Sequence, residues 1–248
     1  MILDIYKDSL EYASKDFDSI LKLGIFTLFS FIFIPIFFIE GYSYRVIKVA
    51  TNGMINGDEP LPKFGNWKDM FIDGLKVIVV KLIYLVVPVV IFYLASEFTN
   101  NMGVKILAVI ISVILFIVLD MFSMVAIPNI AQNDSFKSAF DFEGIFNTLS
   151  SIGWLRYFGF YIGLRIIEGV IELIVFAVLL LIFLIFLGVG SISGIFASID
   201  TVSVIGLVII LLFVLFNSLV VQPFLTIFDS RSIGLVYNIR SLSNMSVI

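Results

Sequence analysis

The sequence predicts an all-α protein: a single integral membrane domain (1–248) built as a polytopic helical bundle of about five spans, with amphipathic helices at the membrane interface. Of the 248 residues, 60% are hydrophobic and 14% are charged, whereas a soluble domain is about half apolar and a quarter charged. The mean hydropathy is +1.14. Runs such as VIELIVFAVLLLIFLIFL do not alternate apolar with polar residues, which argues against membrane β-strands.

Five apolar stretches are long enough to be considered as spans, since a helix needs about 20 residues to cross about 30 Å of hydrocarbon. They cover residues 23–39, 75–95, 104–127, 157–187 and 202–228. The first is short and contains Pro35. It is either a straight span, the favoured interpretation, or part of a re-entrant hairpin over residues 23–49 that bends at the proline. The fourth would extend about 46 Å at helical rise, so it must tilt or project beyond the hydrocarbon.

Lys and Arg in the connections orient these spans. Nine lie after the first span, after the third span and in the tail: Arg45, Lys48, Lys63, Lys68, Lys76, Lys137, Arg156, Arg231 and Arg240. Four lie on the other side: Lys7, Lys15, Lys22 and Lys105. The first group is therefore predicted to be cytoplasmic, in a cell-membrane protein, and residues 188–201 are predicted to lie outside. The re-entrant alternative would make the amino terminus cytoplasmic as well.

Three segments have the spacing of amphipathic helices. Residues 1–22 place apolar side chains at helical intervals between acidic and basic ones, as in a helix that lies in the interface or packs on the ends of the spans. The stretches FGNWKDMFIDGL and FDFEGIFNTL gather aromatic residues on one side, and each precedes a basic residue and a span. This order suggests a weak internal repeat.

The stretch from residue 40 to residue 76 resembles a family of multi-pass membrane proteins that is known only as a domain of unknown function and is frequent in archaea. The features that carry the resemblance are Gly41, Tyr42, Arg45, Asn52, Gly53, Leu61, Pro62, Phe64, Trp67, Phe71, Asp73 and Gly74. The resemblance implies an archaeal source and a place in the cytoplasmic membrane. It implies no reaction, substrate or cofactor.

The fourth predicted span begins with an unusual charged face. Arg165, Glu168 and Glu172 are three, four and seven residues apart, so they share one side of a helix. Gly159 and Gly163 form a GxxxG pair roughly opposite, which permits close approach of another helix. Intramembrane polar groups usually face the bundle interior, so we expect other polar residues to join the cluster. The candidates are Lys81, Asp120, Asn217 and Gln222. The alternative is that the charges are simply hydrated at the membrane surface.

The composition removes several functional classes. The chain has no cysteine and no histidine, so thiolate chemistry and the commonest general base and metal ligand are absent. A net charge of -4 with no basic patch argues against a nucleic-acid partner. We therefore expect a non-catalytic protein without cofactor or metal. It would be a subunit or organiser of a membrane complex, with the lipid bilayer, its own copies or other membrane subunits as partners. The alternative is a small-solute transporter or channel that uses polar residues in helices kinked at Pro88, Pro128 and Pro223.

Overall fold

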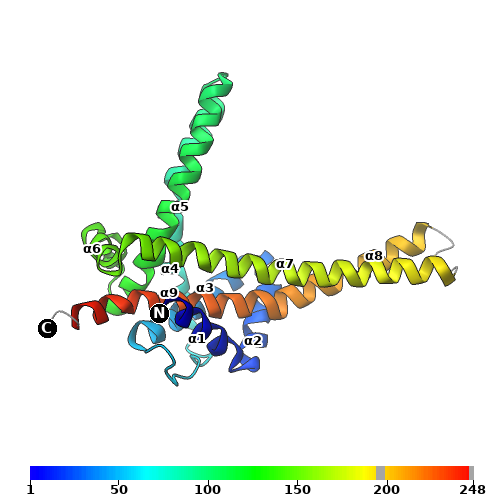
Figure 1. Cartoon of the computed structure of the whole chain (residues 1–248), viewed down its shortest axis with the longest axis horizontal. Helices are drawn as coiled ribbons and strands as arrows, with labels where there is room; N and C mark the ends of the chain where they lie inside the picture. The colour runs from blue at the N-terminus through cyan, green and yellow to red at the C-terminus, as the bar shows by residue number, and fades with distance from the viewer. Residues whose placement is uncertain (194–198, 246–248) are drawn as a thin grey trace.

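The computed structural model describes residues 1–193 and 199–245, and over these residues the protein is all-α. Two long apolar hairpins leave a compact helical head in different directions (Figure 1). Helices α4 and α5 form the first hairpin, and α7 and α8 form the second. Their bounds are Trp67–Phe98 for α4, Met102–Asn133 for α5, Trp154–Ser193 for α7 and Ile199–Phe216 for α8. The predicted class, a helical multi-pass membrane protein, is confirmed.

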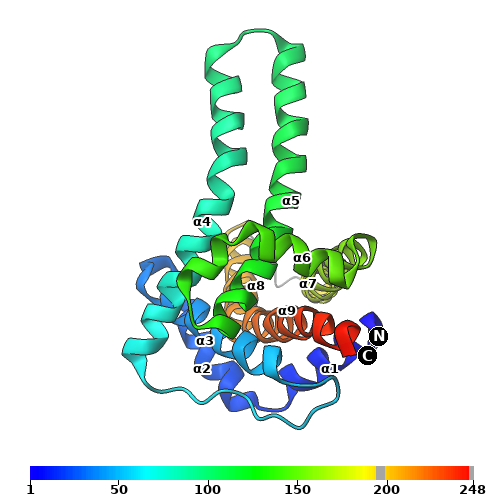
Figure 2. The same cartoon turned by 90° about the vertical axis from the view of Figure 1, so that its left-hand side faces the viewer.

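The head consists of five helices and the bases of the two hairpins. Its helices are α1 (Ile2–Ser14), α2 (Phe17–Leu28), α3 (Ile34–Asn52), α6 (Phe142–Ile152) and α9 (Gln222–Met245). Helix α9 lies at the centre and packs against α1, α3 and α6. Fully buried aromatic side chains from all along the chain fill the core: Tyr12, Tyr42, Tyr157, Phe160, Phe228 and Tyr237. Figure 2 shows that the labelled amino terminus and helix α9 both lie at this head, away from the tip of the α4–α5 hairpin.

Short polar side chains fix several helix starts. Asp16 precedes α2 and accepts a hydrogen bond from the Asp18 N–H at 3.1 Å. Asn101, in the tight turn of the first hairpin, accepts from the Gly103 N–H at 2.9 Å. Asp141 does the same for α6 through the Gly144 N–H at 3.0 Å. Each cap satisfies a backbone donor that has no partner within its own helix, and so sets where the helix begins.

The first predicted span is wrong, because residues 23–39 do not form one helix. Helix α2 ends at Leu28, a 3-10 turn follows at Ser30–Ile32, and α3 begins at Ile34. Phe33 adopts a φ of 68°, which a helix interior does not contain. Pro35 lies in the first turn of α3, where its missing N–H leaves no bond unmade.

Among the described residues, four helical segments rather than five are long and apolar enough to cross a membrane: Trp67–Phe98, Met102–Asn133, Trp154–Phe186 and Gly206–Ile239. The last includes α8 from Gly206 onward, a π-helical turn at Asn217–Val221 and most of α9. Of the connection expected at 188–201, residues 194–198 lie outside the described residues. The four-span count replaces the straight-span interpretation of 23–39.

The predicted amphipathic segments fold differently from one another. Residues 1–22 break after α1, whose apolar face packs on α9 rather than lying free, with Ile5 and Tyr12 fully buried. Trp67 to Leu75 are the first turns of α4 and not a separate helix, while Phe64 stacks on Tyr42 with ring centroids 4.3 Å apart. The segment around Phe142 does form a separate helix, α6.

Helix α7 explains the excess length of the fourth predicted span. Its first three turns belong to the head, where Tyr157, Phe160 and Leu164 are completely buried. Farther along the helix, none of its most apolar 18-residue window is buried within this chain. The predicted projection beyond the hydrocarbon therefore corresponds to a part of the helix that packs in the head.

Of the predicted glycine pair, only Gly163 has a close neighbour within the described part of this chain. A Cβ built at Gly163 would lie 2.5 Å from the Tyr6 hydroxyl, whereas the space around Gly159 is open. Other tight contacts lie elsewhere. Gly41 of α3 and Gly74 of α4 face each other, and Gly24 of α2 meets the backbone of Leu219 in the π-helical turn. Gly159 has no close neighbour among the described residues of this chain, so its predicted role in helix packing stays a prediction.

Candidate functional site

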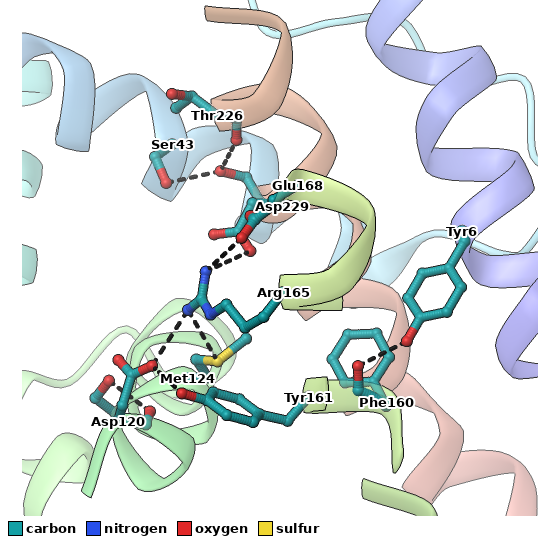
Figure 3. A network of polar contacts seen from close by, with 12 residues as sticks. Tyr6, Ser43, Asp120, Met124, Phe160, Tyr161, Arg165, Glu168, Thr226 and Asp229 are labelled. Atoms are coloured by element: carbon teal, nitrogen blue, oxygen red, sulfur yellow. Dashed lines mark hydrogen bonds and ion pairs between the residues drawn. The ribbon is translucent and has the colours of Figure 1, made fainter. Parts of the chain in front are cut away.

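Arg165 lies at the centre of a charged cluster where the bases of the two hairpins meet α9 (Figure 3). Its Nη2 contacts Asp120 Oδ2 of α5 at 3.2 Å, and its Nη1 contacts Glu168 Oε2 of α7 at 2.8 Å. The same Nη1 lies 3.9 Å from Asp229 Oδ1 of α9. One guanidinium therefore joins three helices through three carboxylates. We refer to Arg165, Asp120, Glu168 and Asp229, together with Lys81 and Glu40, as the polar junction.

Neighbouring side chains fix the orientation of this guanidinium. The Tyr161 hydroxyl donates to Asp120 Oδ2 at 3.0 Å, so the carboxylate is held from two sides. The Arg165 Cζ lies 5.4 Å from the centroid of the Tyr161 ring, a cation-π distance. Tyr161 is one helical turn before Arg165 on α7, so both side chains contact Asp120 of α5 from the same side of the helix.

Lys81 joins the junction from α4 with a partner that the sequence did not suggest. Its ammonium contacts both carboxylate oxygens of Glu40 at 2.7 Å, and Glu40 belongs to α3. The charge of Lys81 is therefore used mainly by Glu40 and not by the carboxylates around Arg165. The result is a second ionic link, from the first hairpin to the head.

Glu172 is held by amides and not by a cation. Asn217 Nδ2 donates to its Oε2 at 3.3 Å, and Gln222 Nε2 donates to its Oε1. These partners stand at the two ends of the π-helical turn. The carboxylate of Glu172 therefore lies beside the turn that joins α8 to α9. Such π-helical turns are frequent at functional sites.

A cavity of about 420 Å³ lies among these groups. Its charged lining consists of Glu40, Lys81, Arg165, Glu168, Glu172 and Asp229, and its neutral polar lining includes Ser43, Gln222 and Thr226. Four carboxyl groups thus face two cations. In surroundings of low dielectric constant such an excess of negative charge is costly unless protons or a cation compensate it.

All seven residues of the predicted polar cluster lie in this region. Arg165, Glu168 and Asp120 are in direct ionic contact, Glu172 joins Asn217 and Gln222, and Lys81 lines the same cavity. Sequence reasoning missed Glu40 and Asp229. A signal existed for Asp229, since it is seven residues after Gln222 on the same helical face. No comparable signal existed for Glu40, because its helix was interpreted as the end of a straight span.

A second network, also missed, ties the ends of the chain together. Arg231 is completely buried, and its Nε donates to Asp8 Oδ1 of α1 at 2.9 Å. Its Nη2 donates to Glu59 Oε2 at 2.8 Å and to the Met54 carbonyl oxygen at 3.2 Å, and the guanidinium covers the ring of Tyr12. Burial opposes the charge of Glu59, but the hydrogen bonds from Arg231 and from the Met54 N–H outweigh it and lower the pKa of that carboxyl.

The described residues contain no group of three or more carboxylates that is placed to hold a metal ion. Hydroxyl groups beside the junction also bond to one another: Ser43 Oγ and Ser230 Oγ are 2.7 Å apart. What the arrangement can do is hold helices in register, and offer carboxylates to a small cation within the cavity.

Comparison with known proteins gives a family but no activity. The family model described as protein of unknown function (DUF4013) matches residues 27–181. These residues include the stretch from residue 40 to residue 76 that carries the resemblance. No curated protein and no solved structure matches the chain. Since the matched residues are more than half of the sequence, this multi-pass membrane protein belongs to the DUF4013 family.

Proposed function

We propose that this protein is a non-catalytic membrane subunit that organises a larger assembly of its own copies or of other membrane proteins. The observation that carries the proposal is the pair of apolar hairpins that stand apart from each other on one head (Figure 1). Each presents helices that the chain itself leaves uncovered. Such helices can bind lipid or other helices on most of their circumference.

The extent of uncovered surface supports this role. In the most apolar windows of α5 and α7, 11% and 0% of the residues are buried within this chain. Large side chains such as Ile110 and Leu181 are more than half exposed. Helices in lipid associate through close packing and polar contacts. The hydrophobic effect does not drive this association, because lipid tails are as apolar as the helix surface. Two separate hairpins give two independent surfaces for such packing.

The polar junction supports an organising role because it fixes the bases of both hairpins to one another. Arg165 of α7 contacts Asp120 of α5, and Lys81 of α4 contacts Glu40 of the head. Ionic contacts at the base of a hairpin restrict how it pivots. Partners bound to the two hairpins would therefore be held at a defined separation.

We further propose that the protein lies in the cytoplasmic membrane with the head in the cytoplasm. With four spans, the amino-terminal lysines Lys7, Lys15 and Lys22 join the nine basic residues already assigned to that side. Twelve basic residues then stand against Lys105 alone. This distribution follows the positive-inside rule more closely than the nine-to-four division of a five-span chain.

Photo-cross-linking tests the organiser proposal. A photoreactive amino acid is placed at Ile110 of α5, at Leu181 of α7, or at Met54 as an exposed control in the head. We expect protein adducts of defined mass from at least one hairpin position and none from Met54, together with an oligomer or complex in native mass spectrometry. Lipid adducts alone, with a monomeric mass, would contradict the proposal.

The cavity favours a second candidate function, the passage of small cations. Its four carboxyl groups exceed its two cations, and it lies beside the π-helical turn and Pro223, where the helix is irregular. Reconstituted vesicles would be tested for fluxes of protons, alkali cations and small organic cations. A flux that Glu172→Gln reduces and Glu97→Gln at the hairpin tip leaves unchanged would support this function. Vesicles no more permeable than protein-free ones would exclude it for these ions.

A further inference from the structure

The connection between α2 and α3 presents a continuous apolar corner that no part of the described chain covers. Phe29, Phe31, Ile32, Phe33 and Ile34 are between 46% and 75% exposed. No charged residue occurs between Lys22 and Glu40, so the corner and the helical turns that flank it are uncharged. Exposed apolar patches of this kind mark interaction surfaces.

The backbone of the corner is suited to hydrocarbon. The N–H of Phe29 donates to the Ile25 carbonyl, that of Ile32 to Phe29, that of Phe33 to Ser30 and that of Ile36 to Phe33. Pro35 has no N–H to satisfy. An unpaired backbone group costs several kcal/mol in hydrocarbon, so a turn that faces lipid must bond its own polar groups. This turn therefore largely meets a condition that an ordinary surface loop does not.

The position of the corner relative to the second hairpin supports entry into lipid. Gly24 of α2 packs against the backbone of Leu219, within the candidate span Gly206–Ile239. The corner begins five residues after this crossing. Nearer the head, Phe26 and Phe38 pack on Trp67, with ring centroids 5.9 Å away in each case. Tryptophan favours the headgroup level, which places the rings of the corner deeper than that level.

We propose that the α2–α3 corner is a re-entrant element: Phe29 to Ile34 enter the hydrocarbon of one leaflet beside the second hairpin, and the chain returns to the side from which it came. Its partner is the acyl chains of the bilayer. The helix rises about 9 Å over the six steps from Lys22 to Leu28, so the tip reaches roughly a third of the hydrocarbon thickness. Glu40, on the returning helix, then lines the cavity near the hydrocarbon boundary.

Site-directed spin labelling tests the depth. The chain has no cysteine, so single cysteines can be introduced without removing others. Phe31→Cys is compared in liposomes with Leu107→Cys on α5, a lipid-facing reference, and with Met54→Cys, an aqueous reference. We expect the label at position 31 to match position 107, with high accessibility to oxygen and low accessibility to a water-soluble nickel chelate. A match with position 54 would overturn the proposal, as would low accessibility to both reagents, which would mean that protein covers the corner.

Sidedness tests the return of the chain. Ser14 and Met54 lie before and after the corner, and both are exposed in the head. Cysteines at these positions should react with an impermeant maleimide from the same side of oriented vesicles. Reaction from opposite sides would mean that residues 23–39 cross the membrane, and would overturn the proposal whether or not the protein organises a complex.

Discussion

Replacing Gly74 with alanine tests how tightly α3 and α4 cross. A Cβ at this position would overlap the carbonyl oxygen of Phe37 and lie 2.7 Å from its carbonyl carbon and 2.9 Å from the nitrogen of Gly41. Ordinary contacts begin near 3.4 Å, so the backbone of α3 must move by roughly 0.7 Å or more. No flexible side-chain end is available to move instead.

Two opposing effects decide the size of the change. Alanine is favoured over glycine in a helix interior by about 0.5 to 1 kcal/mol, whereas overpacking a tight interface costs about 1 to 3 kcal/mol. We expect Gly74→Ala to lose about 1 to 2 kcal/mol of unfolding free energy. The matched control is Gly159→Ala, where no atom lies within 4 Å of the added Cβ, and which should be neutral or gain up to about 1 kcal/mol.

Thermal unfolding in a mild detergent, followed by circular dichroism, measures both variants against the parent. The two substitutions make the same chemical change inside a helix, so their difference isolates the crossing. Equal midpoints for Gly74→Ala and Gly159→Ala would refute the argument. A loss confined to Gly159→Ala would instead indicate that a second molecule packs on that glycine.

Three further predictions concern charge. Arg165→Ala leaves three carboxylates without their shared partner. Because the Arg165 side chain is 39% exposed, we expect a loss of about 2 kcal/mol of unfolding free energy, between the about 0 to 1 kcal/mol of a surface pair and the about 3 to 5 kcal/mol of a buried one. The control, Arg156→Ala at an exposed position of the same helix, should change the melting temperature little. The pKa of Glu59 is lower in the folded protein than in the unfolded chain. Its contribution to folding stability is therefore complete above the unfolded-state pKa and is lost as the pH falls through the folded-state pKa. Glu59→Gln should flatten the decline in melting temperature at acid pH. With a cytoplasmic head, an impermeant maleimide should label Asn100→Cys in intact cells but Asn66→Cys only after permeabilisation; the reverse pattern would invert the orientation.

The membrane class was predictable because apolar runs of about 20 residues without charge are typical of membrane-spanning helices. It failed at residues 23–39 for the same reason. A turn in water is marked by glycine, asparagine or other polar residues, but this one is made of phenylalanine, isoleucine and a single serine. A corner that faces lipid needs no polar residues, so composition alone could not separate a break from a span.

The candidate site was predictable to the extent that it depends on spacing within one helix. Arg165 and Glu168 are three residues apart, and their contact follows from helical geometry. The contact of Arg231 with Asp8 spans 223 positions and depends on how α1 packs across α9, which no local pattern encodes. Glu40 was missed because the favoured interpretation made residues 23–39 a straight span that ends just before it.

The completely buried Arg231 also sets an order of events during synthesis. Helix α9 follows every other described helix, yet α1, the α3–α4 connection and α6 all pack on it or bond to it. Until it emerges from the ribosome, Asp8 and Glu59 lack their cation, and the apolar face of α1 lacks the helix that covers most of it. The hairpin spans must therefore be handed to the membrane insertion machinery while the head is still open. A ribosome that stalls before Arg231 would release inserted helices without a folded head, a product exposed to membrane quality-control proteases.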